Sequence, residues 1–151
     1  MLPAFSTECL HLIYRPDLHQ LTGRWLGSVS EAELHGGYEA LRQAALHHGC
    51  PYWLIDSRRR TSRSLNGPEW VTTHLLPQVQ RELGGGPLCV CFVVLPDYLQ
   101  AMSQSYPTAL LASATAGPVQ FARFLEEGAA NAWLAARQAA ILTDLPTPPQ
   151  Q

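Results

Sequence analysis

The sequence contains no lysine, and its ten basic residues are all arginine. Charged residues make up only 15% of the 151-residue chain, against about 25% in an average soluble domain, and the net charge is −2. A weakly acidic chain lacks the basic face that broad nucleic-acid binding requires. No run of about 18 apolar residues occurs, so we expect no membrane span. The N-terminus has neither the basic start nor the apolar stretch of a secretory signal, which predicts a cytoplasmic protein.

The cysteines and histidines lack the spacings that hold metal ions. The four cysteines include no C-x-x-C pair, and the six histidines include no H-x-x-x-H or H-E-x-x-H motif. We therefore predict no metal site and no cofactor. Cys50 lies two residues after His48, which suggests a nucleophilic cysteine with its histidine base. Catalytic Cys–His pairs are defined by their proximity in the folded structure, however, and proximity in the sequence is poor evidence for one. An enzymatic function has little support, and the thiols are expected to be buried and reduced.

The hydrophobic pattern predicts one α/β domain over residues 1–142. The chain is 46% hydrophobic and long enough for one sizeable core. A pair of antiparallel strands over 8–15 and 20–27 opens it, and helices then alternate with strands. Because such units have right-handed crossovers, we predict a mixed, largely parallel sheet of about five strands flanked by helices. The Pro-rich tail 143–151 is expected to be disordered.

Individual elements carry boundary signals. Ser30 and Glu33 form a capping box for a helix that ends at Gly49. Within that helix, Gly36-Gly37 lowers helix propensity and indicates that another element passes close by. The other predicted elements are strands over 51–56, 88–95 and 119–124, a helix that opens at Pro68 and is kinked by Pro77, and a last helix over about 126–141.

One short segment concentrates positive charge. Four of the ten arginines lie within six residues, namely Arg58, Arg59, Arg60 and Arg63, and subtracting their charges from −2 leaves −6 for the remainder. We predict that the polar segment 57–66 is a loop after the buried strand 51–56. Ligands of open α/β proteins bind at the carboxyl edge of the sheet, where arginine suits phosphate or carboxylate. Two interpretations stay open: a single anion pocket, or a solvated loop whose arginines pair with Asp56 or Glu69.

Several motifs together are similar to a group of small bacterial proteins. They are Tyr14-Arg15-Pro16-Asp17, Gly23-Arg24-Trp25, Ser30-x-x-Glu33-x-x-x-Gly37-Tyr38, Trp53-Leu54-Ile55-Asp56-x-Arg58-Arg59, Trp70 with Pro77, and Phe121-x-x-Phe124 before Ala129-Ala130-x-Ala132-Trp133. Over residues 8–140 the chain resembles the STAS-like class. That class is similar to anti-sigma-factor antagonists and, more distantly, to the CRAL-TRIO lipid-binding fold. The resemblance implies a mixed sheet with helices and a regulatory role.

The resemblance also implies where a partner binds. In anti-sigma-factor antagonists the central strand ends in Asp, and a serine at the start of the following helix is phosphorylated by the partner kinase. Asp56-Ser57 matches the beginning of that motif, whereas Arg58–Arg60 replaces the second serine and the small residues. Phosphorylation of Ser57, Ser62 or Ser64 therefore stays open. We expect a non-enzymatic protein–protein interaction module in bacterial signalling, with an acidic or phosphorylated partner contacting Asp56, Ser57, Arg58, Arg59, Arg60, Arg63 and Ser64.

A second function also stays open. The protein would then be a carrier or sensor of a small anionic or lipid ligand bound between the 57–69 segment and the helix that follows. One of the four tryptophans could line a cavity for an acyl chain, although tryptophans on separate elements most often belong to the core. The Ala-rich last helix adds a homodimer to the partners that the sequence allows.

Overall fold

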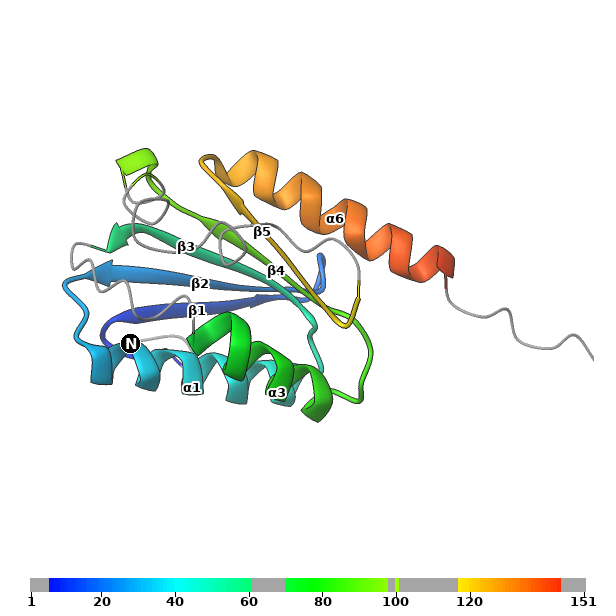
Figure 1. Cartoon of the computed structure of the whole chain (residues 1–151), viewed down its shortest axis with the longest axis horizontal. Helices are drawn as coiled ribbons and strands as arrows, with labels where there is room; N and C mark the ends of the chain where they lie inside the picture. The colour runs from blue at the N-terminus through cyan, green and yellow to red at the C-terminus, as the bar shows by residue number, and fades with distance from the viewer. Residues whose placement is uncertain (1–5, 61–69, 98–99, 101–116, 145–151) are drawn as a thin grey trace, which may run out of the picture.

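Five strands form one mixed sheet in the computed structural model, which describes residues 6–60, 70–97, 100 and 117–144 (Figure 1). Their order in space follows the chain: β1 (Leu10–Arg15), β2 (Gln20–Gly27), β3 (Tyr52–Arg60), β4 (Leu88–Val93) and β5 (Val119–Phe124). β1 and β2 are antiparallel, whereas β2, β3, β4 and β5 are parallel neighbours. The predicted α/β fold class is therefore confirmed.

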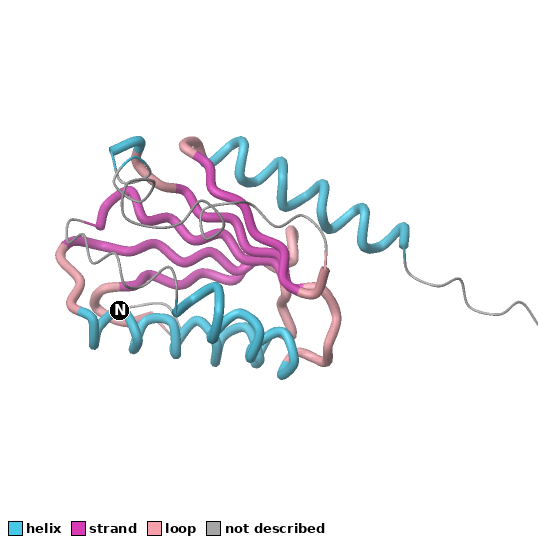
Figure 2. The backbone as a smooth tube through the Cα atoms, in the orientation of Figure 1, coloured by secondary structure: helices cyan, strands magenta, loops and turns pink. Residues whose placement is uncertain are grey.

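Helices cover both faces of this sheet (Figures 1 and 2). α1 (Glu31–His48) and α3 (Leu76–Glu82) lie on one face, and α6 (Glu127–Asp144) lies on the other. Because β2, β3 and β4 follow one another across the sheet in one direction, right-handed crossovers place α1 and α3 on the same side. α6 follows the edge strand β5 and packs back against β4 and β3. Among the described helices, none combines the length and hydropathy that a bilayer crossing needs.

α1 begins and ends where the sequence predicts. The Ser30 hydroxyl accepts a hydrogen bond from the Glu33 backbone N–H at 3.1 Å, and the Glu33 carboxylate accepts one from the Ser30 N–H at 3.1 Å. Gly49 closes the helix in the left-handed region, with φ of 59°. A Cβ added at Gly37 would lie 2.4 Å from the Trp25 ring, whereas one added at Gly36 would meet nothing within 4 Å. The predicted close approach is confirmed at Gly37.

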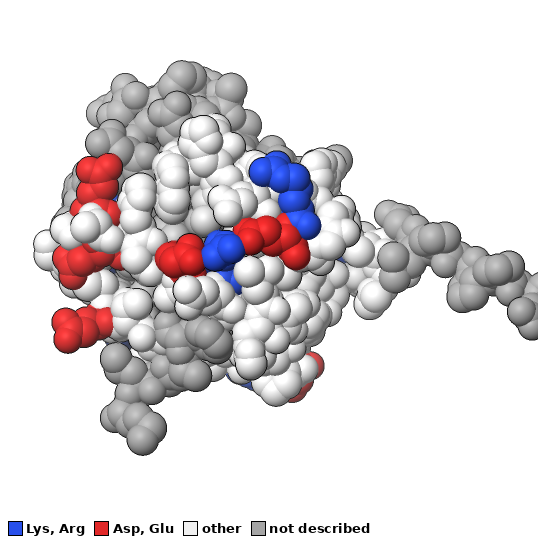
Figure 3. All heavy atoms as spheres, turned by 90° about the horizontal axis from the view of Figure 1, so that it is seen from below, with Lys and Arg blue, Asp and Glu red and all other residues white. Residues whose placement is uncertain are grey.

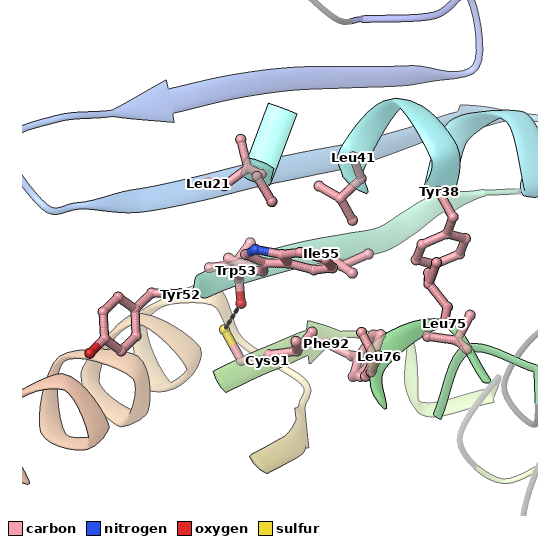
Figure 4. Close-up of a cluster of buried hydrophobic side chains, with 14 of the residues drawn as sticks. Leu21, Tyr38, Leu41, Tyr52, Trp53, Ile55, Leu75, Leu76, Cys91 and Phe92 are labelled. Carbon is pink, nitrogen blue, oxygen red and sulfur yellow. Dashed lines mark hydrogen bonds between the residues drawn. The ribbon is translucent and has the colours of Figure 1, made fainter. Parts of the chain in front are cut away.

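The main core lies between the sheet and the α1–α3 layer (Figure 4). Trp53 is fully buried, and its indole N–H donates to the Cys50 carbonyl oxygen at 2.8 Å. The Cys91 thiol in turn donates to the Trp53 carbonyl oxygen at 3.4 Å. Every residue of β4 is buried, as its continuous apolar sequence predicts, and β4 lies between β3 and the edge strand β5. Trp25 is also fully buried, so two of the four tryptophans are core residues.

Several predicted boundaries are wrong: β1 begins two residues later and β4 ends two residues earlier than predicted, and two further differences are larger in consequence. β3 continues to Arg60, so residues 57–60 belong to a strand rather than to a loop. These polar residues stay in the strand because β2 still pairs with them: Leu26 aligns with Arg59, and Gly27 aligns with Arg60. α6 runs to Asp144, so the helix extends two residues into the predicted tail. The rest of that tail, 145–151, lies outside the described residues.

The sequence predicts a kink at Pro77; the structure has a π-helical turn before it, η1 (Val71–Leu75), which leads directly into α3. The backbone N–H of Leu76 donates to the carbonyl of Val71, five residues earlier. Pro77 has no N–H to donate and is tolerated in the first turn of α3. The helix opening predicted at Pro68 lies outside the described residues.

Candidate binding site at the carboxyl edge of the sheet

A cluster of charged side chains occupies the carboxyl ends of β2 and β3, at the N-terminus of α6. Arg24 of β2 aligns directly with Asp56 of β3, and Glu127 is the first residue of α6. Asp56 is buried, with 7% of its side chain exposed, while Arg24 and Glu127 are about one-third exposed. Three elements that are distant in the sequence therefore meet at one charged site.

Hydrogen bonds link these side chains into one network. The Asp56 carboxylate accepts from Arg24 Nη1 at 2.7 Å, from Arg58 Nε at 3.0 Å and from the Arg58 backbone N–H at 3.0 Å. The Glu127 carboxylate accepts from Arg24 Nη2 at 2.5 Å and from Arg58 Nη2 at 3.3 Å. Two guanidinium groups thus bridge two carboxylates and tie α6 to the sheet.

The hydrogen bonds of the network favour the ionised forms of Asp56, Arg24 and Arg58. Burial alone would raise the pKa of Asp56, but the hydrogen bonds and positive charges of Arg58 and Arg24 outweigh it, so this pKa lies below its ordinary value. The Glu127 and Asp56 carboxylates raise the pKa of Arg24, and Asp56 raises the pKa of Arg58. Asp56 is therefore a carboxylate at neutral pH, and neither guanidinium loses its proton.

A bulge in β3 brings Arg59 into the same site. The register passes from Arg24–Asp56 to Leu26–Arg59, so β3 has one residue more than β2 over this stretch. In a regular strand Arg58 and Arg59 would point to opposite faces. Here both line one open cavity of about 560 Å³ with Arg24, Asp56 and Glu127. The bulge therefore re-aims one arginine towards the face that α6 covers.

Arg59 supplies the surplus charge of this cavity. Its side chain is exposed and forms no ion pair with any of the residues that the structure describes. The other two arginines of the cavity are matched by the two carboxylates, which leaves one positive charge without a counter-charge among the lining residues. A guanidinium in this setting can bind a carboxylate or a phosphate through two parallel hydrogen bonds.

The structure gathers only some of the predicted site residues. Asp56, Arg58 and Arg59 line the cavity, whereas Ser57 and Arg60 are half-buried members of β3 outside its lining. Arg63, Ser62 and Ser64 lie outside the described residues. Sequence reasoning did not select Arg24 or Glu127 as site residues. Arg24 could have been found as the one charged residue inside the second predicted strand, opposite the acid that ends the third.

Three exposed leucines lie at the carboxyl ends of strands along the same edge of the sheet as the cavity. Leu26 lies near the end of β2, Leu95 follows β4, and Leu125 follows β5. Their exposed fractions are 36%, 42% and 47%. Because these strands are parallel neighbours, their carboxyl ends lie along one edge of the sheet, as the arrowheads in Figure 1 show. The edge therefore combines an exposed arginine with exposed aliphatic side chains.

The charges on the α1–α3 face are arranged differently. Arg42 of α1 pairs with Glu39 at 2.7 Å and with Glu82 of α3 at 2.5 Å. Figure 3 looks onto this side of the molecule and shows basic and acidic side chains next to one another on a largely uncharged surface. Arg42 therefore links two helices and has its charge matched by two carboxylates.

Cys50 and His48 do not form a nucleophilic pair. The Cys50 thiol donates to the backbone carbonyls of His19 and Tyr52, both at 3.4 Å, and burial raises its pKa to about 11. The His48 ring instead stacks on Tyr14, with centroids 4.0 Å apart. A buried thiol with this pKa is not a nucleophile at neutral pH.

Comparisons of this chain with protein families, with characterised proteins and with solved structures found no match. The features that bear on function are therefore the fold and the site at the carboxyl edge of the sheet. Together they define an α/β domain with a charged, open cavity at the carboxyl edge of its sheet.

Proposed function

We propose that this protein is a non-enzymatic, STAS-like regulatory module of bacterial signalling that binds another protein through the carboxyl edge of its sheet. One observation carries the proposal: the surplus guanidinium of Arg59 stands at the same edge as the exposed Leu26, Leu95 and Leu125. Arginine and large apolar side chains are typical of the centres of protein interfaces. The partner presents a carboxylate or a phosphate to Arg59 and apolar side chains to the leucines.

The ion-pair network leaves Arg59 as the arginine of this surface that can bind a partner's anionic group. Arg24 and Arg58 are held in place by Asp56 and Glu127, so their charges are already shared within the protein. Arg59 then contributes the directional hydrogen bonds to the partner, and Ser57 lies two residues earlier on β3. A partner that brings one anionic group balances the charge of the cavity, which supports an acidic or phosphorylated protein segment.

A variant experiment tests the edge. Tagged wild-type protein captures its partner from a lysate of the native host, and Arg59→Glu and Leu125→Asp are compared with it. We expect both variants to lose the partner, because one reverses the surplus charge and the other places a charge among the leucines. Leu142→Asp is the control, since Leu142 is 62% exposed near the far end of α6. Retention of the partner by Arg59→Glu, or its loss from Leu142→Asp, would contradict the proposal.

A second candidate function is a carrier or sensor of a small anionic ligand. The volume of the cavity, about 560 Å³, favours it, because small-molecule sites commonly enclose about 300–1,000 Å³. Native mass spectrometry of the purified protein separates the two functions. A bound anion that co-purifies with the wild type and is absent from Arg59→Glu would favour the carrier, whereas a ligand-free protein that still captures its partner favours the module.

A further inference from the structure

Among the described elements, α6 covers only part of its face of the sheet. α6 packs on β4, β3 and β5, while Ile13 of β1 and Leu18 of the β1–β2 turn are 42% and 46% exposed. Two open cavities of about 120 and 290 Å³ follow the flank of α6 and continue from the Arg59 cavity. Adjacent cavities share lining residues: Arg24 and Glu127 at the first junction, and Leu18, Gln20 and Asn131 at the second. They therefore form one groove, which we call the α6 groove.

The chemistry of the α6 groove changes along its length. One end holds the surplus charge of Arg59, and the other is lined by Leu18, Leu134 and Ala135. In the middle, the Gln20 amide nitrogen donates to Asn131 Oδ1 at 3.1 Å and to Thr22 Oγ1 at 3.2 Å. The Gln20 side-chain oxygen and the Asn131 amide nitrogen form no hydrogen bond with other described residues. One acceptor and one donor are what a peptide backbone needs, whereas an acyl chain can use neither.

The length of the groove also suits a peptide. It follows α6 from Glu127 to Gln138, about 16 Å at 1.5 Å of rise per residue. About five residues of extended chain cover that distance at roughly 3.3 Å each. An acidic side chain at Arg59 and an apolar side chain at Leu18 would then stand at opposite ends of one short segment.

From this geometry we propose that the α6 groove binds an extended peptide segment of a partner protein, with an Asp or Glu side chain on Arg59 and an apolar side chain against Leu18 and Leu134. The inference rests on the proposed function, because the Arg59 cavity forms one end of the groove. The inference adds a second contact surface, along α6, whereas the proposed function needs only the carboxyl edge of the sheet.

A phage-displayed library of linear seven-residue peptides, panned against the purified full chain, provides the probe. We expect the enriched peptides to share an acidic residue towards one end and an apolar residue towards the other. A labelled representative is then titrated by fluorescence polarisation. A library that yields no enriched peptides would overturn the inference. So would enriched peptides that lack an acidic residue.

Two neighbouring alanines supply a matched pair of variants. Ala135 lines the groove, whereas Ala136 is exposed outside it, and arginine is a good helix former at either position. We expect Ala135→Arg and Arg59→Glu each to weaken peptide binding at least about tenfold, and Ala136→Arg to change it less than about twofold. Full affinity in Ala135→Arg, or equal losses in Ala135→Arg and Ala136→Arg, would place the peptide elsewhere.

The experiments can contradict the groove inference and the proposed edge function independently of each other. If Ala135→Arg still captures the partner from the lysate while Arg59→Glu does not, the edge function stands and the groove inference is overturned. If peptide binding depends on Ala135 but partner capture is indifferent to Arg59, the proposed edge function fails instead. A fluorescent fatty acid, cis-parinaric acid, that binds the wild type and not Ala135→Arg, without peptide enrichment, would assign the groove to an acyl chain and overturn the inference.

Discussion

Asp56 is ionised in a place where burial alone would favour its protonated form. Its carboxylate is stabilised by hydrogen bonds from Arg24 and Arg58, which hold its pKa below the ordinary value near 4. A carboxyl whose pKa is lowered by folding stabilises the folded state above its unfolded pKa. That stabilisation is lost as the pH falls through the folded pKa. Acid should therefore weaken the ion pairs that join Asp56 to Arg24 and Arg58 on β2 and β3.

Replacing Asp56 with Asn tests this charge. Asp56→Asn keeps the size of the side chain but leaves Arg24 and Arg58 with only Glu127 as a counter-charge. We expect the free energy of unfolding at pH 7 to fall by about 2 kcal/mol. Stability should also decline less between pH 5 and pH 3 in the variant than in the wild type. Urea unfolding at a series of pH values measures both effects, with the exposed Asp97→Asn as control, and identical pH profiles of wild type and Asp56→Asn would contradict the role of Asp56.

Gly37 is required by the closeness of α1 to β2. In Gly37→Ala the new Cβ would lie 2.4 and 2.7 Å from two atoms of the Trp25 ring, which is itself only 1% exposed. We expect the variant to be less stable by about 1–3 kcal/mol because of this overpacking. Gly36→Ala meets nothing within 4 Å and should be more stable by about 0.5–1 kcal/mol, since alanine favours the helix. Chemical unfolding of the two variants compares them directly, and equal shifts would exclude the contact as the cause.

At the scale of whole elements, local patterns were sufficient to predict α1, β4 and β5. The capping box and Gly49 are local signals, and β5 is bounded at residues 119 and 124 as its alternation predicts. The end of β3 could not be predicted in this way. Residues 57–60 are polar, and only their pairing with β2 makes them a strand. A bulge depends on the register of two strands, so nothing in the segment 57–60 alone indicates that Arg58 and Arg59 line one cavity.

The open edge of β1 is covered by the residues that precede it. Ser6 Oγ accepts from the Leu12 backbone N–H at 2.8 Å and donates to the Leu12 carbonyl oxygen at 3.3 Å. Thr7 bonds Leu10 in a similar way, through its hydroxyl at 3.0 Å and its own N–H at 2.9 Å. Covering backbone groups of an edge strand protects it from pairing with another chain.

Removing the Ser6 hydroxyl should expose this edge. Ser6→Ala takes away both bonds to Leu12, and one lost hydrogen bond of about 1 kcal/mol corresponds to about a fivefold change in an equilibrium. We expect the Leu12 amide to exchange its hydrogen at least about fivefold faster, which NMR-detected exchange measures residue by residue. Ser28→Ala changes an exposed serine of the β2–α1 loop and serves as the control. An unchanged Leu12 rate would show that Ser6 does not protect the edge.

Over the whole molecule, the two faces of the sheet are packed unequally. Two helices, α1 and α3, lie on one face, and the buried residues of the core include Trp25, Trp53 and Leu76. α6 alone lies on the other face among the described elements, held at its N-terminus by Glu127 and along its length by the buried Ala130 and Leu134. This inequality makes the edge site and the α6 groove continuous. A second helix beside α6 would fill the groove.

The four free cysteines differ in their exposure to solvent, so their reactivity measures how well the core is protected. Cys50, Cys89 and Cys91 are fully buried, and burial raises their pKa values to about 11, 11 and 12. Cys9 is half-buried, and its thiol donates to the Glu33 carboxylate at 2.6 Å, an interaction that also raises its pKa. Only Cys9 is therefore accessible to a reagent in the folded protein, and it should react more slowly than a free thiol.

Thiol labelling with iodoacetamide at pH 8, followed by intact-mass measurement, tests whether the three buried thiols are protected in the folded protein. We expect the folded protein to gain one label, Cys9→Ser to gain none, and urea-unfolded protein to gain four. The three buried cysteines lie on β4 and immediately before β3, so they should become labelled together, at the rate at which the core unfolds. If Cys50 were labelled early while Cys89 and Cys91 stayed protected, the amino end of β3 would open independently of β4. The sheet would then not unfold as one cooperative unit.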